Sequence, residues 1–286
     1  MKRVANRLLF GLALVFPLAA GGRALSSDPI AQHEPKLLLA EQNVEIPSGA
    51  LTLRGVLFRP PGAGPFSAIV YNHGSERDAS IEYQRGVADW FQSKGYIVLF
   101  PHRRGSGGSQ GAYWKDLADS APDAEYETAV VHALEMENDD VLAAIRWLKK
   151  QSAVDPARIA VAGCSFGGIH SLLAAERSPD IYAALDFAGG AMAWSGSPPL
   201  RARLERAALG AQSPVFFLQA ENDYDTTPSE FLSAIMNEHH KRNQMHIFPR
   251  FGHSPQEGHA GFCNLGMKRW GEEVLGFLES EKAHDH

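Results

Sequence analysis

The sequence predicts an α/β protein, in which a mostly parallel central sheet has helices on both faces and an N-terminal β-hairpin precedes it. Short apolar segments that suit buried strands occur at 67–71, 96–100, 159–162, 183–187, 215–218 and 245–248. Segments with helical spacing follow several of them, at 87–94, 141–150, 167–176 and 269–278. Strands that alternate with helices favour a parallel sheet, and strands that are apolar throughout are typical of burial on both faces.

The hairpin is predicted at the start of the domain. Residues 44–46 and 51–58 alternate or run apolar, and the turn-forming residues Pro47, Ser48 and Gly49 separate them. No internal repeat or linker interrupts 43–281, so this stretch is expected to be one domain. A linker is expected at 27–42 and a C-terminal tail at 282–286. A small extra helix is expected at 201–209, over the edge of the sheet.

Composition and charge narrow the class of protein. The chain has 286 residues, of which 44% are hydrophobic and 21% charged, as is usual for a globular protein. Its net charge of −6 gives no general attraction for nucleic acid or for an anionic membrane. Nucleic acid is therefore not an expected partner.

The first 26 residues have the pattern of an export signal. Three basic residues occur among the first seven, the run 8–20 is apolar, and small residues follow at 21–26. The apolar run is shorter than the roughly 20 residues of a membrane span, and Pro17 interrupts it. We expect cleavage so that the mature chain begins within 23–28 and is periplasmic or secreted, with no stable membrane insertion afterwards. An uncleaved anchor is the alternative.

The strongest chemical signal is Gly-Cys-Ser-Phe-Gly at 163–167, a Gly-x-Ser-x-Gly pattern between an apolar strand and a helix rich in small residues. A sharp strand-to-helix turn of this kind exposes the serine hydroxyl, and the glycines allow close backbone packing. Ser165 is the predicted nucleophile. The free N–H of Phe166 at the start of the helix can hold an oxyanion.

A second segment suits the same site. The apolar strand that ends at Tyr71 is followed by Asn72, His73, Gly74 and Ser75. A His-Gly pair after an upstream strand is where enzymes with this serine turn place their second oxyanion donor. The backbone N–H of Ser75 is the candidate, and an ordinary turn is the alternative.

These motifs resemble the α/β-hydrolase superfamily. The hairpin, His73-Gly74, the Gly-rich loop 104–109 and the serine turn 163–168 carry the resemblance, which covers about 43–278. The chain is most similar to the dienelactone hydrolase-like group, which grades into the prolyl-oligopeptidase-like peptidases. The founding dienelactone hydrolases use cysteine as nucleophile, whereas here Ser165 stands at that place. This departure argues against dienelactone itself as the substrate.

The resemblance implies an acid in the loop after the strand 215–218. Asp223 fits that place best, Asp225 is the main alternative, and Glu221 is a third. The acid would bind one imidazole nitrogen of the base and fix its tautomer.

The base is expected after the strand 245–248. His259 lies in Glu-Gly-His-Ala-Gly-Phe at 257–262, which resembles the family's base loop, while His253 is closer to the strand and is the alternative.

The expected function is hydrolysis of a small carboxylic ester or lactone through an acyl-enzyme, which needs no cofactor and no metal. A serine peptidase of the prolyl-oligopeptidase-like type is one alternative, disfavoured because those enzymes usually carry a propeller domain. A non-catalytic binding protein on a hydrolase scaffold is another.

Further expectations concern the surroundings of the site. The two cysteines, Cys164 and Cys263, are expected to be free, buried thiols, because a bridge would stiffen the serine turn. His170 is expected to pack under the site, and the loop 103–111 to form one wall of the pocket. The aromatic side chains that could either line an apolar acyl site or pack in the core are Trp114, Trp194, Phe251 and Phe262.

Overall fold

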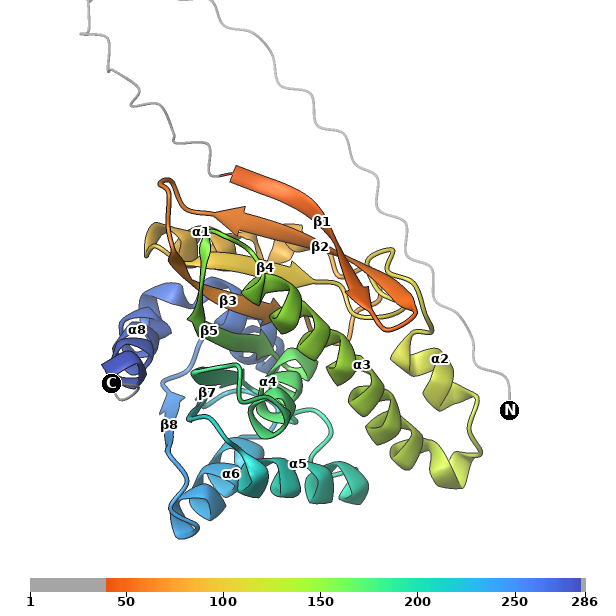
Figure 1. The fold of residues 1–286 in the computed structure, drawn as a ribbon. Helices are drawn as coiled ribbons and strands as arrows, with labels where there is room; N and C mark the ends of the chain where they lie inside the picture. The colour runs from red at the N-terminus through yellow and green to blue at the C-terminus, as the bar shows by residue number, and fades with distance from the viewer. Residues whose placement is uncertain (1–39, 284–286) are drawn as a thin grey trace, which may run out of the picture. The chain divides into compact units, whose positions relative to one another are not determined.

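A computed structural model describes residues 40–283 of the chain. The predicted α/β architecture is confirmed: in this part of the chain, strands β1 to β8 form one sheet in the order β1-β2-β4-β3-β5-β6-β7-β8 (Figure 1). Strands β1 (Ala40–Ser48) and β2 (Leu51–Arg59) form the expected antiparallel hairpin. The first strand therefore begins within the stretch expected to be a linker. The expected signal segment, 1–26, lies outside the described residues.

The six remaining strands run parallel to one another. They are β3 (Phe66–Asn72), β4 (Ile97–Pro101), β5 (Val154–Cys164), β6 (Ala183–Phe187), β7 (Val215–Ala220) and β8 (Asn243–Phe248). Strands β4, β6 and β7 are buried along their whole length, which explains why their sequences are mostly apolar. The carboxyl ends of parallel strands meet at one edge of the sheet, where ligand sites of such folds are found.

Helices cover both faces of the sheet. One face carries α2 (Trp114–Asp119), α3 (Tyr126–Lys149), α4 (Phe166–Arg177), α5 (Pro198–Gly210) and α6 (Thr227–Glu238). The other face carries α1 (Arg85–Ser93), α7 (Phe262–Leu265) and α8 (Met267–Ala283). In the view of Figure 1, α3 and α4 lie in front of the sheet. Helix α8 continues two residues into the expected C-terminal tail, and α5 contains the expected small helix.

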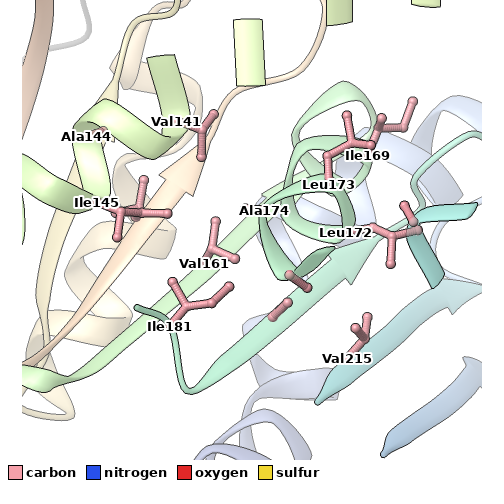
Figure 2. Close-up of a cluster of buried hydrophobic side chains, with 14 of the residues drawn as sticks. Val141, Ala144, Ile145, Val161, Ile169, Leu172, Leu173, Ala174, Ile181 and Val215 are labelled. Carbon is pink, nitrogen blue, oxygen red and sulfur yellow. The ribbon is translucent and has the colours of Figure 1, made fainter. Parts of the chain in front are cut away.

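The larger core lies between the sheet and α3 and α4. Figure 2 shows Ile145 of α3 and Leu173 of α4 on either side of Val161 of β5. All three side chains are buried, and each such side chain contributes roughly 1.5–3 kcal/mol when it leaves water. This packing holds the first turn of α4, which begins directly after Ser165, at a fixed place on the sheet.

Between residues 40 and 283, no helix is both long and apolar enough to cross a membrane.

Candidate active site

Ser165 lies in a strained turn between β5 and α4. Its backbone has φ 60° and ψ −117°, a conformation that L-residues rarely adopt, and its N–H donates to the carbonyl of Phe187 at 2.9 Å. A Cβ on Gly167 would lie only 2.1 Å from the carbonyl oxygen of Asn72, so no larger residue fits there. The glycine therefore lets the turn approach β3 closely while the half-buried serine lies at the sheet edge.

His259 and Asp223 form a buried pair beside this turn. His259 lies in a π-helical turn, Glu257–Gly261, and its Nδ1 lies 2.8 Å from Oδ1 and 3.0 Å from Oδ2 of Asp223. The side chains are 5% and 0% exposed. A carboxylate at Nδ1 selects the tautomer with the proton on Nδ1 and the lone pair on Nε2. Nε2 of His259 has no hydrogen-bond partner among the described residues and is available to accept a proton.

The alternative acids and base lie elsewhere. Asp225 accepts the N–H of Thr227 at 2.9 Å, in a local turn before α6, and Glu221 is exposed. The ring of His253 is exposed, and its backbone N–H donates to Glu257 at 2.8 Å. The structure thus brings Asp223 and His259 together and leaves the three alternatives in other contacts.

Two backbone N–H groups are candidates for holding an oxyanion. Phe166 is the first residue of α4, where a helical N–H has no partner within the helix. The carbonyl of Ser75 accepts the indole N–H of Trp114 at 3.0 Å, and Ser75 lines the same cavity as Ser165 and His259.

Arg103 fixes the peptide that carries the N–H of Ser75. It donates to the carbonyl of His73 at 2.9 Å and to that of Gly74 at 2.6 Å. In a trans peptide the C=O and the following N–H point in opposite directions. Because Arg103 holds the Gly74 carbonyl, the N–H of Ser75 must point away from Arg103.

A buried charge network supports Arg103 from below. Arg103 and Glu137 are 0% and 1% exposed and form an ion pair at 2.8 Å; Nε2 of His170 lies 3.1 Å from the same carboxylate. Burial raises the pKa of Glu137, but Arg103 and His170 outweigh it and hold that pKa below its ordinary value. Burial and the Arg103 charge lower the pKa of His170 to about 4, so its ring is neutral at pH 7. His170 packs under the site as expected, whereas sequence reasoning missed the network.

The expectation of free thiols is wrong. Cys164 and Cys263 form a disulfide with their Cα atoms 5.9 Å apart, within the usual range for such bridges. Cys164 immediately precedes Ser165, and Cys263 in α7 is one helical turn after His259. The bridge therefore joins the serine turn to the histidine segment.

A cavity of about 370 Å³ opens over these groups. Ser75, Ser165 and His259 line it, together with two buried carboxamides, Gln84 and Asn264, that sequence reasoning missed. None of the four aromatic residues considered for an acyl site is among its lining residues: Phe262 and Trp194 are buried in the core, and Trp114 and Phe251 are partly buried against it.

Comparison with known proteins agrees with this fold. The model of the "Prolyl oligopeptidase family" matches residues 82–198, which include Ser165. The esterase Pf2001 of Pyrococcus furiosus superposes with a TM-score of 0.62 at 17% identity, over 85% of this chain and 90% of its own. A dienelactone hydrolase of Anabaena variabilis superposes with a TM-score of 0.55 at 18% identity, over 82% of this chain and 98% of its own. The chain has the α/β-hydrolase fold.

Among curated proteins, the chain is similar to a polyketide transferase of Penicillium sp, with 30% identity over 47% of this chain and 40% of that protein. The chain spans 40% or less of the length of the curated relatives it matches. The matches and the fold together support an enzyme of the serine hydrolase type.

Proposed function

We propose that this α/β-hydrolase is an exported serine esterase that cleaves carboxylic esters or lactones through an acyl-enzyme. The observation that carries the proposal is the His259–Asp223 pair, which leaves Nε2 of His259 without a partner among the described residues, in a side chain that lines the same cavity as Ser165. This is the arrangement that removes the proton from a serine hydroxyl.

In the proposed reaction, Ser165 Oγ attacks the carbonyl carbon while His259 Nε2 takes its proton. The N–H groups of Phe166 and Ser75 bind the oxyanion, and Asp223 stabilises the charged imidazole. When the C–O bond breaks, His259 returns the proton to the leaving alcohol. Water, activated by the same histidine, then releases the acid and restores the serine.

The test is Ser165→Ala. We expect it to abolish hydrolysis of p-nitrophenyl acetate and labelling by a fluorophosphonate, since loss of a serine nucleophile typically costs on the order of 10⁶ in turnover. Circular dichroism should be unchanged. Undiminished hydrolysis by the folded variant would refute the proposal, and failure of the native protein to react with either reagent would favour a binding protein.

A peptidase is the second candidate, because the prolyl oligopeptidase family model matches the segment around Ser165. Peptide p-nitroanilides and p-nitrophenyl esters with the same acyl group separate the two. An esterase should turn over only the ester at a useful rate.

Export is supported by the signal-like N-terminus and by the disulfide, since disulfides persist in oxidising compartments. The intact mass of protein recovered from an exported fraction tests it. A mature chain that begins within 23–28 is the expected result, and full-length chain in the membrane pellet would indicate an anchor.

A further inference from the structure

The cavity beside Ser165 combines apolar surface with several polar and acidic side chains. Its apolar lining comes from Ala260, Cys164 and the exposed side chains of Tyr83 and Met192. The charged side chains that line it are the exposed carboxylates of Glu76 and Asp78, and no lysine or arginine is among its described lining residues. Such a wall suits a substrate that donates hydrogen bonds and disfavours an anionic one.

Asn264 places a free acceptor in this wall. The residue is 2% exposed, and its Nδ2 donates to the carbonyl of Ala260 at 2.8 Å. That bond fixes the orientation of the amide, because a carbonyl can only accept. Oδ1 of Asn264 is buried and has no hydrogen-bond partner among the described residues. Buried polar atoms are nearly always paired, so the unpaired Oδ1 of a residue that lines the cavity points to a ligand.

Gln84 adds a second polar group from another element. It is 3% exposed and lines the cavity at the start of α1, and its side chain makes no capping hydrogen bond to that helix. Helices α1 and α7 contact each other, so Gln84 and Asn264 come from neighbouring segments of the wall.

We propose that Asn264 and Gln84 are specificity residues that bind a hydroxyl or ammonium group of the substrate close to the scissile ester. Asn264 Oδ1 accepts the hydrogen bond, Gln84 makes a second polar contact, and Glu76 and Asp78 make the cavity favourable to a donor or a cation. The proposal rests on the esterase function proposed above and narrows its substrates to hydroxy- or amino-substituted esters.

The test compares p-nitrophenyl esters that differ by one group on the α-carbon: isobutyrate with a methyl, lactate with a hydroxyl and alaninate with an ammonium. The ratio of kcat/KM for lactate or alaninate to that for isobutyrate is measured in the native protein and in Asn264→Leu and Gln84→Met. The intrinsic reactivity of each ester is the same for the native protein and the variants, so it cancels when their ratios are compared. We expect the ratio for at least one donor to fall about threefold to tenfold in each variant, the range of one hydrogen bond.

A matched control is Gln256→Met. Gln256 also lines the cavity, but it is exposed and its Oε1 already accepts the hydroxyl of Tyr224 at 2.8 Å. Its ratio should equal that of the native protein. Asn264→Leu also loses the bond to Ala260 and could therefore fold less well, so Gln84→Met tests the proposal independently. Retained isobutyrate hydrolysis shows that each variant is folded.

A second pair tests the alcohol side of the ester: 2-hydroxyethyl butyrate against propyl butyrate, followed by release of butyrate. If the variants lower the preference for 2-hydroxyethyl butyrate over propyl butyrate but leave the ratios of the acyl series unchanged, the subsite binds the leaving group. Equal ratios in the native protein and both variants, for both the acyl and the alcohol series, would overturn the proposal while leaving the esterase function intact. Absence of any ester hydrolysis would instead refute the esterase function.

Discussion

Replacing both Cys164 and Cys263 by alanine is expected to destabilise the protein strongly. The bridge joins residues 99 positions apart, and in the chain-entropy model a loop of about 100 residues gives roughly 4.7 kcal/mol of stabilisation. For a domain of 150–250 residues, each kcal/mol corresponds to about 2–4 °C in Tm. The double variant should therefore melt roughly 10–20 °C below the native protein.

The assay is thermal unfolding of both proteins, with and without a phosphine reductant. The reductant should lower the Tm of the native protein toward that of the double variant and should leave the double variant unchanged. At 25 °C, where both are folded, the variant should also have a lower kcat, because the bridge fixes the serine turn against the segment that carries His259. Native and variant proteins with Tm values within about 3 °C of each other would show that this reasoning is wrong.

Other predictions concern charged groups. Asp223→Asn should lower kcat about 10⁴-fold by favouring the wrong tautomer of the histidine, while Asp225→Asn should stay near the native rate, both measured with p-nitrophenyl acetate. Arg103→Met should cost about 3–5 kcal/mol in urea unfolding, because it leaves Glu137 buried without its cation. Adding Glu137→Gln should recover much of that stability but not kcat, because the Gly74 carbonyl is still released; recovery of both would contradict the assigned role. Burial raises the pKa of Asp186 to about 7. The folded protein therefore keeps a proton that the unfolded chain loses near pH 4, and stability falls as pH rises from about 4 to 7. Asp186→Asn should remove this loss, so its gain in Tm over the native protein should be larger at pH 8 than at pH 4.5; an equal gain at both would contradict the raised pKa.

Strands β4, β6 and β7 were predictable because burial on both faces makes their sequences mostly apolar. Helix α3 was harder: it begins at Tyr126, well before the predicted start at 141. The part of α3 that was not predicted, residues 126–140, contains the buried carboxylates Glu137 and Asp140. These polar residues interrupt the helical pattern of apolar ones. These carboxylates are buried because Arg103 and Arg104 pair with them from a distant loop, which no local pattern reveals.

Within the candidate site, residues next to strand ends could be predicted and their contacts from other elements could not. The turn around Ser165 follows from local order along the chain, while Asp223 and His259 were preferred to their alternatives because their loops resemble those of the α/β-hydrolase superfamily. The disulfide was missed because nothing local indicates that α7 lies against the serine turn. Gln84 and Asn264 gave no signal, because a buried carboxamide at a helix end looks like any polar surface residue in a sequence.

Because Arg103 holds the Ser75 peptide from the protein interior, the loop after β3 can bind the oxyanion with one part and contact the substrate with another. Arg103 grips the carbonyls of His73 and Gly74 from the protein interior, and none of its contacts involves the residues that follow Ser75. Those following residues include Glu76, Asp78 and Gln84, which form a wall of the cavity. Glu76 should be kept because it accepts the N–H of Gly74, but Asp78 and Gln84 can be changed without releasing the oxyanion donor. This makes the stretch 78–84 the natural place to diversify in a library selected for new ester substrates.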